Sequence, residues 1–221
     1  MPIHLKKAIN RLMEQLIALS ASVEDSVKQA VRSLEEKNIQ LAEQVIKNDE
    51  EIDKREMDIE EECLKIFALH QPVAIDLRYL VAVLKINNDL ERIGDLASNI
   101  SRHSIKILSN PIPIRSSHFH IQEMYNHVQP MLKKSLDAIV NLDVDTAHEI
   151  LKADDEVDHM HKDIAKKVIE EIQNNSDHAD ILLYYLHIAR HLERIADHAT
   201  NIAEDVIYLI KGEIVRHSIV V

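Results

Sequence analysis

Residues that end helices or form turns are scarce in this sequence. Among 221 residues there are two glycines and five prolines, and the chain has one cysteine, no tryptophan and only 3% aromatic residues. Long helices with an aliphatic core are therefore expected, because little in the chain interrupts a helix and few rings are available for packing. With Cys63 as the single cysteine, no intrachain disulfide can form, and this residue is expected to be a partly buried, inert thiol.

Basic residues are also in short supply. The chain has 26 Lys and Arg residues against 38 Asp and Glu residues, a formal net charge of −12. This balance argues against binding to nucleic acid or to anionic membranes. Residues 1–16 carry scattered charges and no apolar segment, so they are not expected to be a signal peptide. No run approaches the ~20 apolar residues that span a bilayer, and we expect a soluble, cytoplasmic protein.

The sequence does contain an internal repeat. Residues 89–100, DLERIGDLASNI, return at 191–202 as HLERIADHATNI, and residues 49–53, DEEID, return at 154–158 as DDEVD. The two offsets are 191 − 89 = 102 and 154 − 49 = 105 residues, so the repeat unit is about half of the chain. We therefore expect two copies of one module, residues 1–110 and 114–212, followed by a short tail, residues 213–221.

Apolar residues at helical spacing predict three long antiparallel helices in the first module. The first runs from Ile3 to about Glu36. The second follows Asn38 as its N-cap and stops near His70, and the third has Pro72 in its first turn and ends near Leu108. Residues 110–113, Asn-Pro-Ile-Pro, cannot continue a helix and are expected to link the modules.

The same spacing predicts three helices in the second module. Ser116 or Ser117 is expected to cap the first, and Pro130 is expected to kink that helix without ending it. The second runs from about Asp143 to Asn174, the turn at residues 174–177 caps the third, and the third ends at Lys211-Gly212. The predicted fold class is all-α: a rod of two tandem three-helix bundles, six long antiparallel helices related by internal duplication.

Acidic residues recur at equivalent positions of both modules and face away from the apolar stripes. They form i, i+4 pairs on the second and third helix of each module: Asp49 and Asp53, Glu91 and Asp95, Asp154 and Asp158, Glu193 and Asp197. If the two helices are neighbours, the pairs face one another as an open set of oxygen ligands suited to magnesium, manganese or iron, with zinc a further candidate. His161 lies on the same stripe as Asp154 and is a possible imidazole ligand.

Other interpretations of the acidic pairs remain open. Carboxylates at this spacing are common on solvated helix faces, and Arg92 or Arg194 could pair with them in a structural ion-pair network. Gly94 in mid-helix and its counterpart Ala196 indicate only that a small side chain suffices there. The sequence has no phosphate-cradling glycine loop, nucleophile elbow or Cys-His pair, so we do not expect an enzyme.

Two long strings in the sequence resemble the PhoU family of bacterial and archaeal regulators of phosphate uptake: residues 72–100, PVAIDLRYLVAVLKINNDLERIGDLASNI, and residues 191–212, HLERIADHATNIAEDVIYLIKG. The resemblance covers nearly the whole chain. Gly94 matches the family's LERIGD pattern, and Ala196 departs from it. The resemblance implies two three-helix bundles whose Glu- or Asp-xxx-Asp motifs hold multinuclear metal clusters, which here correspond to the four acidic pairs.

The resemblance also implies an adaptor that is not an enzyme. When phosphate is plentiful, such proteins damp the phosphate-specific ABC transporter and the sensor histidine kinase of the phosphate regulon. They are thought to contact the transporter's ATPase and the kinase, to reach the membrane through these partners, and to self-associate, with a homodimer or higher oligomer expected here.

Two functions other than the adaptor are compatible with long acidic helices. A ferritin-like di-iron carboxylate enzyme needs Glu-x-x-His pairs that project into a helical core, and the first module lacks such a pair. A spectrin-like structural spacer would use the acidic stripes only for solubility, although the duplicated LERI-x-D motif is more specific than a spacer needs.

Overall fold

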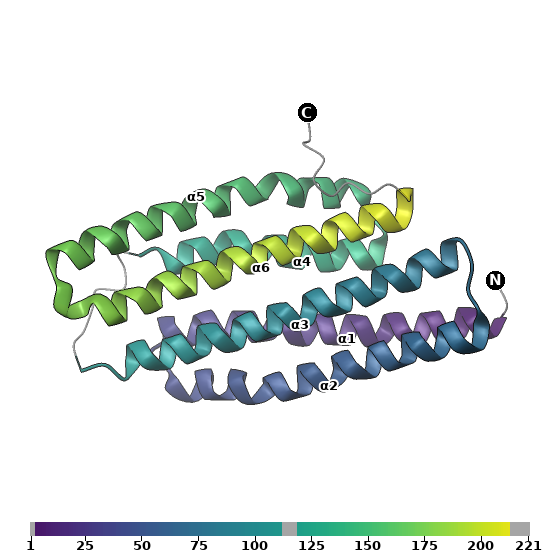
Figure 1. Ribbon diagram of the computed structural model, residues 1–221, viewed down its shortest axis with the longest axis horizontal. Helices are drawn as coiled ribbons and strands as arrows, with labels where there is room; N and C mark the ends of the chain where they lie inside the picture. The colour runs from purple at the N-terminus through teal and green to yellow at the C-terminus, as the bar shows by residue number, and fades with distance from the viewer. Residues whose placement is uncertain (1–2, 112–118, 213–221) are drawn as a thin grey trace.

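The computed structural model describes residues 3–111 and 119–212, and these residues form six long helices and one short 3-10 turn (Figure 1). The elements are α1 (Ile3–Glu35), α2 (Ile39–His70), α3 (Ile75–Leu108), α4 (Ile121–Asn141), α5 (Val144–Asn174), the 3-10 turn η2 (Ser176–His178) and α6 (Ala179–Lys211). The all-α prediction is confirmed. The predicted tail lies outside the described residues.

Local capping residues fix several helix ends where the sequence predicted them. The Asn38 side chain accepts a hydrogen bond from the backbone N–H of Leu41 at 3.1 Å, which caps α2. Asp143 caps α5 by accepting from the backbone N–H groups of the second and third residues after it. Gly212 ends α6 in the left-handed conformation with φ of 74°, where a residue without a side chain is least strained.

Two predicted helix starts are wrong. Pro72 is not in the first turn of α3, because Gln71 and Ala74 have φ of 44° and 50°, which no α-helix tolerates, so the helix begins at Ile75. α4 begins at Ile121 and not at Ser116 or Ser117, which lie outside the described residues.

Two further expectations for the second module concern Pro130 and the start of the last helix. Pro130 lies inside α4 without ending it, as predicted, and the kink stays a prediction. The polar turn before α6 forms η2 rather than a simple cap, and His178 precedes α6 without a side-chain capping hydrogen bond.

The two modules pack side by side along α3 and α6, which run antiparallel through the middle of the molecule (Figure 1). α1 and α2 cover α3 on one side, and α4 and α5 cover α6 on the other. The rod is therefore six aligned helices, and not two bundles end to end. Buried aliphatic side chains from both modules join in one core, which includes the thiol of Cys63. The module boundaries at residues 110 and 114 stay a prediction.

The interface between α3 and α6 contains polar side chains that the sequence analysis did not single out. Asp89 accepts from His198 Nδ1 at 2.8 Å, and the buried Asp205 accepts from Lys85 Nζ at 3.0 Å. At the other end of the interface, His103 stacks on His187 and His191, with ring centroids 5.2 and 5.4 Å apart.

The internal duplication relates the two ends of this interface. At the 102-residue offset Lys85 corresponds to His187, and His103 corresponds to Asp205. One end of a pseudo-symmetric interface therefore holds an ammonium–carboxylate pair, and the equivalent end holds a pair of imidazoles.

Gly94 allows α2 to lie close to α3. A Cβ atom built on Gly94 lies 3.1 Å from Ile52 Cγ2 and 3.5 Å from Asp49 Oδ1. In the second module the equivalent positions hold a larger residue and a smaller one, Ala196 and Val157. The side-chain volume added at the glycine position is thus removed at the facing one.

This compensation predicts that Gly94→Ala alone lowers the free energy of unfolding by about 1 kcal/mol, because crowding against Ile52 outweighs the gain in helix propensity. Adding Ile52→Val should recover only part of that loss, because valine lacks Cδ1, which lies 3.4 Å from the built Cβ atom, but keeps the nearer Cγ2. Urea denaturation of the three proteins measures both effects. The compensation is wrong if the single variant is as stable as the wild type, or if the second change deepens the loss.

Candidate functional site

α2 and α3 bring the four predicted carboxylates of the first module together. Asp49 is half-buried beside Gly94, and its pKa is raised by burial and by the neighbouring charges of Asp53 and Asp95. A hydrogen bond with Ser98 acts in the opposite direction on this pKa. The expected adjacency of the two acidic stripes is confirmed here.

The other carboxylates of this cluster repel one another in the same way. Burial raises the pKa of Asp53 and of Glu91, and the charge of Asp95 raises both further. Arg92 lies beside the cluster, with Nε 3.4 Å from Glu91 Oε2 and Nη1 3.6 Å from Asp95 Oδ2. Because these ion pairs are long and solvent reaches Arg92, they offset little of the repulsion.

The second module builds an equivalent cluster between α5 and α6. The pKa of Asp154 is raised to about 6, first by burial and then by the charges of Asp197 and Asp158. Burial and the charge of Asp158 also raise the pKa of Asp197. Asp154 and Asp197 both lie beside the negative charge of Asp158, and a bound cation would offset this repulsion.

Glu193 does not face solvent as the helical stripe predicted. It is 8% exposed, because α6 is packed against α3, α4 and α5 and little of its surface is left free. One carboxylate oxygen accepts from Arg190 Nη1 at 2.5 Å, and the other, Oε2, is buried without a hydrogen-bond partner. Arg190, and not the nearby Arg194, forms the ion pair with Glu193.

His161 lies beside this cluster, as its position on the stripe predicted. Its Nδ1 is 4.0 Å from Glu193 Oε1, and burial together with the charge of Arg190 lowers the pKa of the imidazole. The neutral ring is therefore available as a nitrogen ligand next to the carboxylate of Glu193. Carboxylate oxygens and one imidazole nitrogen form a donor set that fits borderline divalent cations.

The side chains are not, as they stand, arranged as a closed metal site. Within residues 3–111 and 119–212, no group of three or more His, Cys, Asp or Glu side chains is placed to hold a metal ion. The Glu-x-x-His pair of the second module, Glu156 and His159, is exposed on α5 and does not enter the core. This placement argues against the ferritin-like arrangement, which needs such pairs to point inward.

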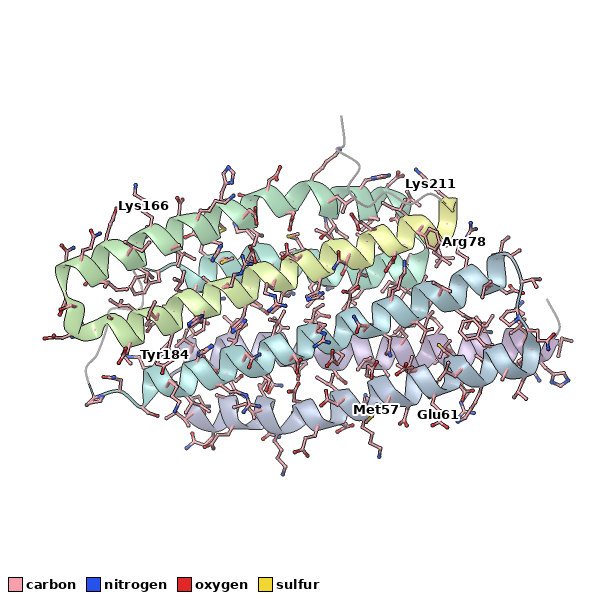
Figure 2. The ribbon with its side chains drawn as sticks, in the orientation of Figure 1. Met57, Glu61, Arg78, Lys166, Tyr184 and Lys211 are labelled. Carbon is pink, nitrogen blue, oxygen red and sulfur yellow. The ribbon has the colours of Figure 1, made fainter. Side chains whose placement is uncertain are left out.

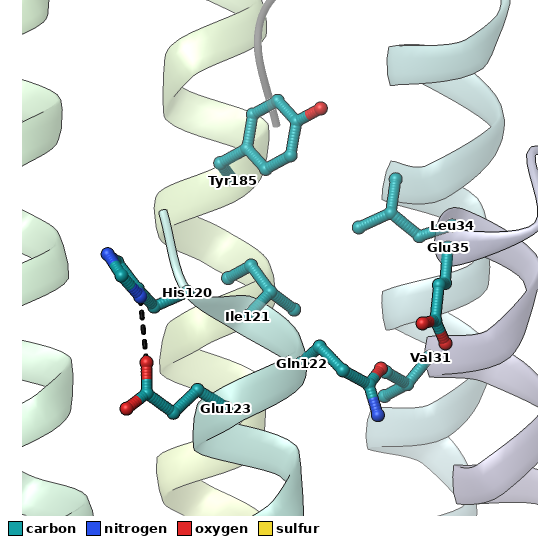
Figure 3. Close-up of a pocket in the computed structure, with 8 residues that line it drawn as sticks. All are labelled: Val31, Leu34, Glu35, His120, Ile121, Gln122, Glu123 and Tyr185. Atoms are coloured by element: carbon teal, nitrogen blue, oxygen red, sulfur yellow. Dashed lines mark hydrogen bonds and ion pairs between the residues drawn. The ribbon is translucent and has the colours of Figure 1, made fainter. Parts of the chain in front are cut away.

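A separate pocket opens where the end of α1 meets the start of α4 (Figure 3). Eight residues line it: Val31, Leu34, Glu35, His120, Ile121, Gln122, Glu123 and Tyr185. His120 Nδ1 and Glu123 Oε2 are 2.7 Å apart across the first turn of α4, as the dashed line in Figure 3 marks. These eight residues include no serine, cysteine or lysine.

Comparison with known proteins places this geometry in a family. The model of the PhoU domain matches residues 16–103 and again residues 121–206. The phosphate-specific transport system accessory protein PhoU homolog 1 of Thermotoga maritima is 35% identical over 211 residues, which cover 96% of this chain and 90% of that protein. The Aquifex aeolicus PhoU homolog is 36% identical and covers 96% of this chain and 95% of its own length.

Solved structures agree in fold and in family. The crystal structure of PhoU from Pseudomonas aeruginosa superposes with a TM-score of 0.90 at 34% identity, covering 94% of this chain and 99% of that one. PhoU from Streptococcus pneumoniae, a phosphate transport system regulatory protein, gives 0.86 at 26% identity, with 95% and 98% covered. Among the described residues no helix is long and apolar enough to cross a membrane. On the duplicated domain match and on identities near 35% over almost the full length, this chain belongs to the PhoU family.

Proposed function

We propose that this protein is a metal-binding regulatory adaptor of a phosphate transport system, and not an enzyme. The observation that carries the proposal is the same acidic cluster built twice: Asp49, Asp53, Glu91 and Asp95 in the first module, and Asp154, Asp158, Glu193 and Asp197 in the second. Crowded carboxylates at both places are costly for folding, and their retention after duplication favours a shared ligand.

The donors fit magnesium, manganese, iron or zinc, with His161 an additional nitrogen ligand in the second module. A bound cation would supply positive charge that offsets carboxylate repulsion and would turn an acidic, repulsive helix face into a surface suited to docking. The buried Oε2 atom of Glu193, which lacks a hydrogen-bond partner, supports a ligand on this side of α6. Binding requires the carboxylates to rotate toward one another, since they do not converge as they stand.

The names of the relatives support the adaptor role. They are accessory or regulatory proteins of phosphate transport systems. We infer that this chain contacts the ATPase of the phosphate-specific ABC transporter and the sensor histidine kinase of the phosphate regulon. By these contacts it lowers phosphate uptake and signalling when phosphate is plentiful. We also expect it to be cytoplasmic and to act as a homodimer.

The test is metal stoichiometry by elemental analysis after the protein has been offered magnesium, manganese, iron and zinc. Wild type is expected to retain metal, and Asp95→Ala/Asp197→Ala is expected to lose nearly all of it while remaining helical by circular dichroism. The matched control is Asp58→Ala/Asp163→Ala, because these exposed carboxylates lie on α2 and α5 at equivalent positions outside the clusters. This control removes the same net charge.

The adaptor part is tested by binding of the metal-loaded protein to the purified ATPase of the transporter. Binding is expected to fall at least about tenfold after chelation and in the Asp95→Ala/Asp197→Ala variant, and to be unchanged in the control. Equal metal content in all three proteins contradicts the metal sites. Undiminished binding by the metal-free protein contradicts the role of metal in docking.

A further inference from the structure

Exposed apolar side chains gather at one end of the molecule, at the turn that joins α2 to α3. Leu69, Val73 and Ile75 are 78%, 71% and 68% exposed, and Leu77 follows them on the first turn of α3. Ile3, at the start of α1, is 72% exposed and lies at the same end of the molecule (Figure 1). We call these five residues the α2–α3 tip. Single exposed apolar residues are ordinary, but a group of this kind at one end is not.

The fold does not require this apolar group, because the second module makes the equivalent turn without it. There the turn between α5 and α6 is residues 174–178, Asn-Asn-Ser-Asp-His. At the 102-residue offset Ile75 corresponds to Asp177, and Leu77 corresponds to Ala179. Two copies of one module thus share helices and core but differ in the polarity of this turn, so the apolar side chains of the tip need a reason other than folding.

Charge around the tip has the opposite sign to that of the chain as a whole. Lys6 and Lys7 are exposed on the first turns of α1. Arg78 projects from the start of α3 toward the end of α6, where Lys211 lies (Figure 2). Asp76 is the acidic residue at this turn, and Lys65, one turn before Leu69, is paired with Glu61 at 2.9 Å. The chain carries a net charge of −12, yet this end presents an apolar centre with a cationic rim.

We propose that the α2–α3 tip is a membrane-docking surface that inserts Leu69, Val73 and Ile75 into the interface of an anionic lipid bilayer. Apolar side chains enter the headgroup region, and flanking lysines and arginines bind anionic headgroups. Docking is end-on, with the helix axes steep to the membrane, because the apolar residues lie at the end of the rod and not along a side.

End-on docking also keeps the acidic cluster of the first module away from the lipid surface. Asp53, in the acidic cluster of the first module, lies 17 residues before His70 along α2, which is about 25 Å at 1.5 Å per residue. The Debye length is about 8 Å at physiological ionic strength, so that cluster is screened from the lipid surface. The tip acts independently of metal in the acidic clusters.

Because the chain has no tryptophan, a single introduced tryptophan is a direct fluorescent probe of membrane insertion. Val73→Trp places one indole at the tip, and Met57→Trp places one at a similarly exposed position in the middle of α2, which Figure 2 labels. With phosphatidylglycerol–phosphatidylcholine vesicles, the emission of Val73→Trp is expected to shift to the blue and that of Met57→Trp to stay unchanged. With pure phosphatidylcholine vesicles the shift is expected to be several-fold weaker at the same lipid concentration.

Vesicle flotation of the otherwise native chain tests the residues themselves. Val73→Ser/Ile75→Ser is expected to weaken binding at least about tenfold, and Lys6→Glu/Lys7→Glu to weaken it in a salt-dependent way. The control Met57→Ser/Leu64→Ser removes two exposed apolar side chains from α2 outside the tip and is expected to bind like wild type. All six substituted residues are exposed, and circular dichroism checks that the variants are folded.

The proposal is overturned if wild type does not float with anionic vesicles, or if the tip variants float as well as wild type. It is also overturned if Val73→Trp and Met57→Trp respond alike. If the tip variants instead lose binding to the transporter ATPase while no protein binds vesicles, the tip is a protein-docking surface and the lipid assignment is wrong. Neither vesicle result depends on metal content, so failure here is separate from failure of the metal sites.

Discussion

Lys85→Met is expected to lower the free energy of unfolding by about 3 kcal/mol, because it removes the positive charge of Lys85 from beside a buried carboxylate. Asp205 is 1% exposed on α6, and Lys85 Nζ on α3 lies 3.0 Å from its Oδ1. The pair also joins the two modules, because these residues are 120 positions apart. Methionine keeps the length and apolar contacts of the lysine stem, so the loss reports the charge. Urea denaturation followed by circular dichroism measures it.

A double-mutant cycle separates the pair from general disruption of the interface. With Asp205→Leu already present, Lys85→Met is expected to cost less than about 1 kcal/mol, because the buried carboxylate that the lysine would face is no longer there. The control Lys47→Met changes an exposed lysine on α2 and should have little effect. A loss below about 1 kcal/mol for Lys85→Met in the wild-type background would contradict the importance of this pair for joining the modules.

Acid is expected to destabilise the protein through the stacked imidazoles at the other end of the same interface. The pKa of His191 is lowered from 6.5 to about 4, first by burial and then by the positive charges that His103, His187 and Arg194 would place beside it. Its Nδ1 is buried without a hydrogen-bond partner. The folded state therefore resists a proton that the unfolded chain accepts.

This difference in proton binding makes the folded protein less stable in acid. Above pH 6.5 both states are neutral at this residue and its contribution is fully present; as the pH falls from 6.5 to 4, the unfolded state gains a proton and stability is lost. The shift corresponds to a loss of about 2 kcal/mol once solvent access to the ring is allowed for. His103, whose pKa is lowered by burial and by His187, adds to the loss.

The measurement is the free energy of unfolding of wild type and His191→Gln between pH 7 and pH 4. The difference between the two proteins is expected to change by about 2 kcal/mol over this range, with the variant losing less stability in acid. The carboxylates of the acidic clusters, whose pKa values are raised, work in the opposite direction in both proteins and cancel in the difference. His159→Gln, an exposed change on α5, serves as the control. Parallel curves for wild type and His191→Gln would contradict the role of this ring.

The sequence predicted a helix end correctly where a single capping residue is sufficient to fix that end. Asn38, Asp143 and Gly212 each satisfy or redirect backbone groups of their own helix, so no distant contact is needed. The start of α3 was predicted wrongly, because proline permits a first turn without requiring one. The positive φ of Ala74 decides the boundary, and alanine gives no sequence signal for that conformation.

For the candidate site, the sequence predicted which side chains share a helix face but not how deeply each one is buried. The i, i+4 spacing put Glu91 and Asp95 on one face, and the repeat put Asp154 and Asp158 on another, because both follow from helix geometry alone. The burial of Glu193 and its pairing with Arg190 depend on how many neighbours cover α6, which the spacing does not contain. His161 was found because it shares the stripe.

The sequence by itself determined that the chain is two copies of a three-helix module with an aliphatic core and two acidic helix pairs, since helical periodicity and internal repetition are both set by the order of residues along the chain. Only the tertiary structure decided that α3 and α6 face each other, that Asp89 meets His198, and that His103 stacks on two other histidines. These contacts join residues far apart in the chain through polar side chains. From the sequence alone such polar side chains predict an exposed helix face, because the pattern does not show that another helix packs over them.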